Sequence, residues 1–138
     1  WEYAARGGLE GAEYAWGNAL APDGLMLANY WQGPFPVHNT LADGWLFTSP
    51  VDAFPANGYG LHDMIGNVWE WTSSTFEPFP GFVRDPYKEY SEPWFGTHKV
   101  LRGGSFATPA RLIRATWRNF YMPHRSDPFA GFRTCALD

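Results

Sequence analysis

The stretch GLHDMIGNVWEWTSS, Gly60 to Ser74, decides how this chain is organised. Asp63 and Glu70 stand seven residues apart in it, with the flexible pair Gly66-Asn67 between them. If both carboxylates and the carbonyls of that turn face one point, they form an oxygen-only cage of the kind that calcium prefers. The ligands would be Asp63, Gly66, Val68 and Glu70. The alternative, which spacing alone favours, is that Asp63 caps a turn and Glu70 pairs with an arginine.

A second group of oxygen-bearing side chains lies upstream. Asn29 in LANYWQG and Asp43 in LADGWLF are fourteen residues apart, and an ordered loop could bring them together. The pair alone is weak evidence for a cation site.

The composition predicts one folded domain with little regular structure. The 138 residues suffice for one hydrophobic core, and 19% aromatic against 17% charged residues is far from a disordered composition. Fifteen Gly and twelve Pro interrupt almost every potential element, so we expect short elements joined by long ordered loops. KVLRGGSF, 99–106, predicts a strand, whereas ARLIRATWRNF, 110–120, is compatible with helix or strand.

The charges are distributed unevenly. Residues 1–101 carry twelve acids and four bases, whereas residues 102–138 carry six arginines and two acids. This is a poor footprint for nucleic acid. Arginines suit a small carboxylate ligand, because the guanidinium group binds a carboxylate in a two-pronged geometry. Structural ion pairs are the alternative for each arginine.

The N-terminal WEYAARGG, 1–8, has the features of the last turns of a helix, with Gly7-Gly8 as a left-handed stop. Because no N-cap precedes it, we expect residues 1–138 to be the C-terminal part of a longer polypeptide. Cys135 is the only cysteine, so no internal disulfide is possible. The sequence has no apolar run of about 18 residues and no signal-peptide pattern, which predicts a cytoplasmic protein without membrane contact.

Nearly the whole chain resembles the formylglycine-generating enzyme (sulfatase-modifying factor) family. The resemblance rests on the run from WGNALAPDG through GLHDMIGNVWEWTSS and on the later VLRGGSF and GFRTC motifs. It implies a compact α+β, C-type-lectin-like fold with few regular elements and structural Ca²⁺. One implied calcium is held by the Asn29 and Asp43 side chains with the Tyr30 and Trp45 carbonyls. The other is held by Asp63, Gly66, Val68 and Glu70, which makes calcium the favoured interpretation of the opening stretch.

The sequence departs from the oxidation chemistry of that family. Formylglycine-generating enzymes oxidise a substrate cysteine with a pair of copper-binding cysteines that follow the GGS strand. Here the corresponding segment, ATPARLIRATWRNF, contains no cysteine, and Cys135 lies outside it. A single thiol cannot build such a site, so formylglycine-generating activity is not predicted.

The C-terminal part is similar to the C-terminal domain of ergothioneine-type sulfoxide synthases, and its ending NFYMPHRSDPFAGFRTC also to selenoneine-synthase-like relatives. In that group a non-haem Fe²⁺, bound by three histidines, uses O₂ to join a thiol or selenium donor to the imidazole of trimethylhistidine. The histidines belong to an N-terminal helical domain that this sequence does not include, and its own four histidines form no HxxxH pair. The resemblance therefore implies an oxidoreductase that needs the missing domain, and an inactive isolated chain.

The same resemblance implies a substrate-binding wall formed by Trp117, Asn119, Phe120, Tyr121 and Arg125. Arg125 is implied to grip the carboxylate of the sulfur donor, and Phe120 to receive a trimethylammonium group by cation–π attraction. Tyr121 stands where some members carry aspartate, which leaves the donor open among cysteine, γ-glutamyl-cysteine and a selenosugar. For Phe120, core packing is the alternative role.

One tyrosine of DPYKEYSE, Tyr87 or Tyr90, is implied to lie near the iron and to donate a proton. For these tyrosines too the alternative is core packing, and the residues do not decide between the two positions. Two other functions stay open: a formylglycine-generating oxidase, and a non-catalytic ligand-binding module on the same fold.

Overall fold

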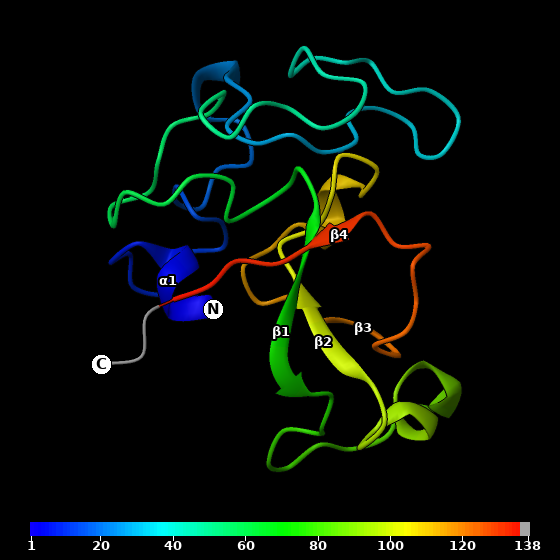
Figure 1. Ribbon diagram of the computed structural model, residues 1–138. Helices are drawn as coiled ribbons and strands as arrows, with labels where there is room; N and C mark the ends of the chain where they lie inside the picture. Colours follow the sequence, from blue (N-terminus) through cyan, green and yellow to red (C-terminus); the bar gives the residue numbers. More distant parts are fainter. Residues whose placement is uncertain (136–138) are drawn as a thin grey trace.

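Short elements joined by long loops make up the fold. The computed structural model describes residues 1–135, and its helix and strands are α1 (Glu2–Arg6), β1 (Trp69–Thr75), β2 (Lys99–Arg102), β3 (Asn119–Tyr121) and β4 (Ala130–Gly131). Short 3₁₀ turns occupy Pro22–Gly24, Lys88–Tyr90, Glu92–Trp94 and Ala110–Leu112. Figure 1 shows the blue-to-cyan loops gathered above the sheet. The α+β class with scarce regular structure is confirmed.

The four strands form one mixed sheet in the order β3-β2-β1-β4 (Figure 1). β1 and β2 are antiparallel, with Glu70 opposite Arg102. β3 is antiparallel to β2 with Phe120 opposite Val100, and β4 lies parallel to β1. The strand predicted in KVLRGGSF is confirmed as β2, while the ambiguous ARLIRATWRNF is a 3₁₀ turn leading into β3.

The helix at the N-terminus ends as its sequence predicts. Gly7 adopts the left-handed conformation (φ 56°), and its N–H donates to the Ala4 carbonyl over 3.2 Å. The Asn57 amide donates to the same carbonyl over 2.7 Å, which attaches α1 to a loop some fifty residues later. Ala5 is fully buried and belongs to the hydrophobic core.

The Gly66-Asn67 turn joins the loop region to the sheet. Both residues have positive φ, 82° and 62°. The Gly66 N–H donates to the Gly103 carbonyl over 2.9 Å, and the Asn67 N–H donates to the Asn29 carbonyl over 2.8 Å. The Asn67 carbonyl accepts from the Phe106 N–H over 2.9 Å, and its side-chain amide exchanges two bonds with the backbone of Ser49. This turn is therefore bonded to three segments that are distant in the sequence, at Asn29, at Ser49 and at residues 103–106.

The hydrophobic core lies between α1, the loops of residues 14–30 and the segment before that turn. Tyr30, Met64 and Ile65 are each 2% exposed, and Ile113 is fully buried. Burial of these side chains holds the loops in place where regular backbone pairing is scarce. None of the helices within residues 1–135 combines the length and the apolar character that crossing a bilayer requires.

Replacing Gly66 by alanine is expected to destabilise the protein strongly. An added Cβ would lie 3.0 Å from the Asn29 carbonyl carbon, and closer still to its oxygen, in a backbone conformation that already disfavours side chains. Gly81→Ala is the matched control, because its φ is 79° and nothing lies within 4 Å of its added Cβ. We expect a loss of about 1–2 kcal/mol for Gly81→Ala and at least about 3 kcal/mol for Gly66→Ala in urea titrations. Equal losses would show that the close approach is unimportant.

Candidate functional site

An aromatic cavity of about 310 Å³ opens beside β3. Its lining includes five of the seven residues that the sequence assigned to substrate binding or proton donation. They are Tyr90, Trp117, Asn119, Phe120 and Tyr121. The antiparallel pairing of β3 with β2 fixes three of these on one short strand, so their relative positions depend on backbone hydrogen bonds.

Phe120 is held by a stack of rings. One of its faces lies against Phe76, with ring centroids 4.1 Å apart and planes inclined by 16°. His98 approaches edge-on, with a centroid distance of 5.9 Å. Phe120 is half-buried and is one of the residues that line the cavity, while Phe76 covers one face of its ring.

The structure separates the two candidate tyrosines. Tyr87 immediately precedes one 3₁₀ turn and Tyr90 is its last residue. The Tyr90 N–H donates to the Tyr87 carbonyl over 3.3 Å, and the two ring centroids are 6.3 Å apart. Tyr90 is part of the cavity lining, whereas Tyr87 is not among the lining residues of the described chain. Tyr90 is therefore the better placed of the two to reach a ligand there.

Arg125 lies next to the cavity, with its charge already paired. Its Nε and Nη2 donate to the two carboxylate oxygens of Asp127 over 2.5 and 2.6 Å, and its guanidinium lies 5.5 Å from the Tyr121 ring centroid. Arg125 holds the pKa of Asp127 below its ordinary value, mainly through these hydrogen bonds. A ligand carboxylate would have to compete with Asp127, a partner that the sequence reasoning missed although it stands only two residues away.

Of the first predicted cation cluster, the structure brings the Asp43 carboxylate to the backbone N–H groups of Tyr30 and Trp45. Its Oδ2 accepts from the Tyr30 N–H over 3.2 Å, and its Oδ1 accepts from the Trp45 N–H over 2.9 Å. The Asn29 amide donates to the Phe47 carbonyl over 2.7 Å, while its Oδ1 is buried without a hydrogen-bond partner within residues 1–135. A buried oxygen without a donor suits a cation ligand. Gln32, which the sequence reasoning missed, donates to both Asp43 and the Tyr30 carbonyl.

The second predicted cluster lines an open cavity of about 360 Å³. Asp63, Gly66, Val68 and Glu70 all lie on its wall. Within the described chain, Asp63 Oδ1 is buried without a partner, and its Oδ2 accepts from the Asn67 amide over 3.3 Å. Burial raises the pKa of Asp63, with the bond from Asn67 opposing the shift. The Asp63 carboxylate therefore also fits a cation.

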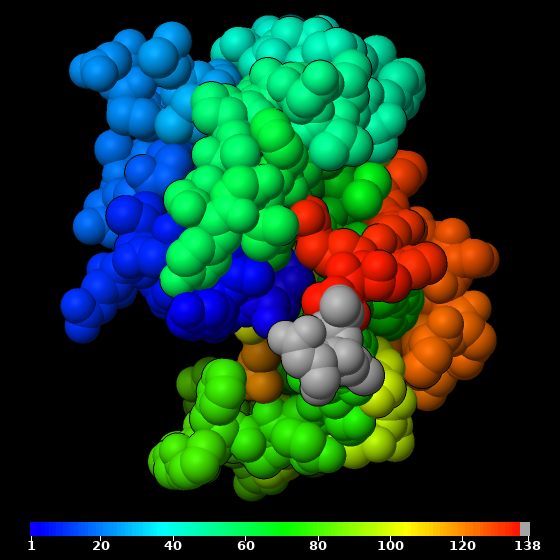
Figure 2. Space-filling model, turned by 60° about the vertical axis from the view of Figure 1, so that its left-hand side comes forward, coloured from blue at the N-terminus to red at the C-terminus, as the bar shows by residue number. Residues whose placement is uncertain are grey.

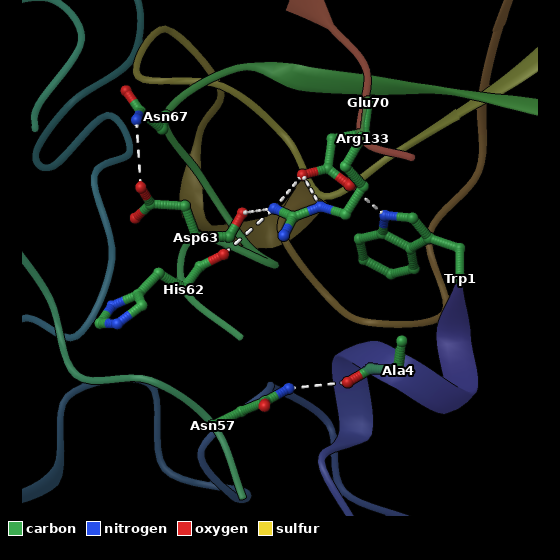
Figure 3. A network of polar contacts seen from close by, with 8 residues as sticks. All are labelled: Trp1, Ala4, Asn57, His62, Asp63, Asn67, Glu70 and Arg133. Atoms are coloured by element: carbon green, nitrogen blue, oxygen red, sulfur yellow. Dashed lines mark hydrogen bonds and ion pairs between the residues drawn. The ribbon is translucent and has the colours of Figure 1, made fainter. Parts of the chain in front are cut away.

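Arg133 enters this second cluster from the C-terminal segment (Figure 3). Its Nε donates to Glu70 Oε1 over 2.7 Å, and its Nη2 donates to Glu70 and to the carbonyls of His62 and Asp63. Glu70 Oε2 accepts from the Trp1 indole over 2.5 Å. Glu70 thus has the arginine partner of the alternative interpretation, and a cation would share its carboxylate with Arg133. The GFR motif contained this residue, but nothing in the sequence paired it with Glu70.

The carboxylates in these clusters are few. Within residues 1–135, no three His, Cys, Asp or Glu side chains lie close enough together to hold a metal ion. A cation at either cluster would therefore take most of its ligands from backbone carbonyl and amide oxygens, which is a calcium-like donor set. The Ca²⁺ ligand assignments stay a prediction.

Fold and site together define a loop-rich α+β domain of the formylglycine-generating-enzyme type, with two oxygen clusters and an aromatic cavity. The family model described as "Sulfatase-modifying factor enzyme 1-like domain" matches residues 1–137. The chain belongs to this family.

Similar proteins carry more than one activity. A formylglycine-generating enzyme of Streptomyces coelicolor is 45% identical over all of this chain and 44% of its own length. A hercynine oxygenase of Mycobacterium tuberculosis is 43% identical over 72% of this chain and 24% of its own length. Among solved structures, Treponema denticola variable protein 1 superposes with a TM-score of 0.71 and 28% identity, over 96% of this chain and 43% of that one. The chain spans less than half the length of these relatives.

Removal of calcium is expected to lower the melting temperature. A cation that binds only the folded state at 100 times its Kd contributes about 2.7 kcal/mol, which corresponds to roughly 10 °C for a domain of this size. Differential scanning calorimetry with excess EDTA and with added CaCl₂ measures this change, with MgCl₂ as the control for ionic strength. Identical melting curves would remove the calcium assignment.

Asp63→Asn is expected to raise the melting temperature only when calcium is absent. Without calcium at pH 7 the ionised Asp63 is destabilising, because burial raises its pKa, so the neutral amide raises the melting temperature. With calcium the variant does not melt at a higher temperature than the parent, because the substitution removes a charged ligand of the cation. The cost of ionisation is absent below the ordinary pKa of aspartate and develops as pH rises through the raised value, so the gain in EDTA vanishes near pH 3 (about one unit below the ordinary value). A variant that melts lower than the parent in EDTA at pH 7 would contradict this.

Proposed function

We propose that this domain forms the substrate-binding part of a non-haem iron, O₂-dependent oxidoreductase, a sulfoxide synthase that joins a thiol or selenium donor to the imidazole of trimethylhistidine. The observation that carries the proposal is the single cavity lined by Tyr90, Trp117, Asn119, Phe120 and Tyr121. The hercynine oxygenase relative supports it, since its name denotes oxidation of a trimethylated histidine. The domain would work in the cytoplasm, within a longer polypeptide that supplies the iron ligands.

The aromatic wall suits a trimethylammonium group. Such a cation cannot donate hydrogen bonds and is attracted to an aromatic face, and the aromatic residues Trp117, Phe120 and Tyr121 line this cavity. The Asn119 Oδ1 accepts from the Phe120 N–H over 2.9 Å, which fixes the amide so that its Nδ2 group can donate to a substrate carboxylate. The cation and the carboxylate of one amino-acid betaine would thus be bound by residues that line the same cavity.

Tyr90 is proposed as the proton donor. The iron, when bound by the upstream domain, would supply the activation of O₂. The phenol of Tyr90 lies on the cavity wall and can give its proton to a group bound beside Phe120 and Trp117. The rigid rings around it would orient the imidazole and exclude water from its reacting carbon.

A formylglycine-generating oxidase is the second candidate, because the S. coelicolor enzyme matches the whole chain. That family's copper site needs a cysteine pair, and the segment after the GGS strand has none. Titration with copper(I) discriminates between the two: tight binding by this chain would favour the oxidase. An upstream sequence without an HxxxH pair and a third histidine would remove the sulfoxide synthase.

Phe120→Leu is expected to weaken binding of trimethylhistidine by about 3- to 30-fold and binding of unmethylated histidine far less. The loss of a cation–π contact of about 0.5–2 kcal/mol affects only the methylated ligand. Isothermal titration of the full-length protein measures both ligands, and Phe35→Leu, in a distant loop, is the control. Equal weakening for both ligands would mean that Phe120 only packs.

Tyr90→Phe is expected to lower the rate of sulfoxide formation by about 10²- to 10⁴-fold in the full-length protein, because a positioned general acid contributes that much. Tyr87→Phe is the matched control, on the same 3₁₀ turn but outside the cavity lining, and should keep nearly the parental rate. The reverse ranking of the two variants would assign the proton donor to Tyr87.

A further inference from the structure

A hollow of about 430 Å³ separates the N-terminal segment from the loop that follows β1. Trp1 and Glu2 form one side, and β1 from Thr72 to Thr75 forms the other. Figure 2 shows an open notch between the blue and green segments, with orange atoms on its floor. Two arginines line this hollow: Arg102, the last residue of β2, and Arg118, which directly precedes β3.

Arg102 is a fixed cation in the wall of the hollow. It is 7% exposed, and its guanidinium lies 4.9 Å from the Trp1 ring centroid. Its Nη2 donates to Glu2 Oε2 over 2.8 Å and to the Ala115 carbonyl, while its Nε is buried without a partner in the described chain. Glu2 also pairs with Arg6 over 2.8 Å. One carboxylate therefore serves two guanidinium groups, and part of the positive charge is uncompensated.

Arg118 adds a second cation, and no carboxylate in residues 1–135 pairs with it at ion-pair distance. Its Nη1 donates to the Glu77 carbonyl over 2.9 Å, and its guanidinium lies 4.0 Å from the Phe79 and 5.0 Å from the Phe76 ring centroid. Burial and repulsion from Arg102 lower the pKa of Arg118. Stacking on the rings leaves the N–H edge of this planar group as the part that can bind a ligand.

We propose that this hollow is a binding site for a carboxylate group, held edge-on by Arg118 with Arg102 as the second cation. A planar carboxylate matches the edge of a guanidinium in two parallel hydrogen bonds. The hydroxyls of Ser74 and Thr75 line the same hollow and add uncharged donors. Glu2 and Glu77 also face it, and their charge favours a monoanion over a phosphate or sulfate dianion.

This site is distinct from the aromatic cavity and does not depend on the proposed synthase activity. Arg118 is the one residue that the two linings share. The carboxylate could belong to a small organic acid or to the C-terminus of a peptide, since both present the same group to Arg118.

The test is an NMR titration of the arginine Nε–Hε resonances in the unsubstituted protein with propionate, N-acetylglycylglycine and inorganic sulfate. We expect saturable shifts at Arg118 and Arg102 with both carboxylates and weaker binding of sulfate. Arg111 is the internal control, because it too lies over an aromatic ring without an ion pair in the described chain, and it should not shift. Tighter binding of the dipeptide would indicate a peptide ligand, and equal binding a small acid.

Arg118→Gln is expected to weaken propionate binding at least about tenfold, because it removes both the positive charge and the two-pronged N–H edge of the guanidinium group. Arg111→Gln is expected to leave propionate binding unchanged. Arg118→Lys should also lose most of the affinity, since an ammonium lacks the two-pronged edge. The proposal is overturned if Arg118 shows no saturable shift, if sulfate binds more tightly than both carboxylates, or if Arg118→Gln binds like the parent. None of these outcomes affects the assays of Tyr90 or Phe120.

Discussion

Two consecutive left-handed residues, Gly66 and Asn67, connect the loops of this domain to its sheet. The carbonyl of Asn29 comes so close to Gly66 that no side chain fits between them. The backbone N–H of Asn67 donates to the Asn29 carbonyl, and the Asn67 carbonyl accepts from the Phe106 N–H. These contacts join residues that lie side by side in the structure but are far apart in the sequence. A chain with so few paired strands has little else to fix its loops, so these backbone bonds and the core beside them determine where each loop lies.

The same turn places the polar and the aromatic parts of the molecule. Asn29, Ser49 and Asp63, the three residues with buried unpartnered side-chain oxygens in the described chain, all contact it, and β1 begins two residues after Asn67. β1 then positions β2, whose pairing with β3 presents Phe120 to the cavity. A cation bound at the loops would therefore stabilise the scaffold of the cavity without touching a ligand.

The sequence predicted the local features well, because single residues determine them. The end of α1 followed from Gly7-Gly8, β2 from the strand-like run KVLRGGSF, and the turn from Gly66-Asn67. Five of the seven residues that were predicted to bind substrate or donate a proton line one cavity. Long-range pairings could not be predicted: Arg133 meets Glu70 across 63 positions, and residue types do not specify which acid an arginine finds. Nor did the spacing show that Asp127 forms an ion pair with Arg125, since the side chains of residues that are close in the sequence can point in different directions.

Native-state hydrogen exchange tests most directly whether the Gly66-Asn67 turn is part of the structural core. We expect the amides of Gly66, Asn67 and Phe106 to exchange only by global unfolding, with the same free energy as buried Leu101 in β2. Exchange of the Asn67 amide through an opening about 2 kcal/mol or more below that of Leu101 would contradict it, because the turn would then open while the sheet stays folded.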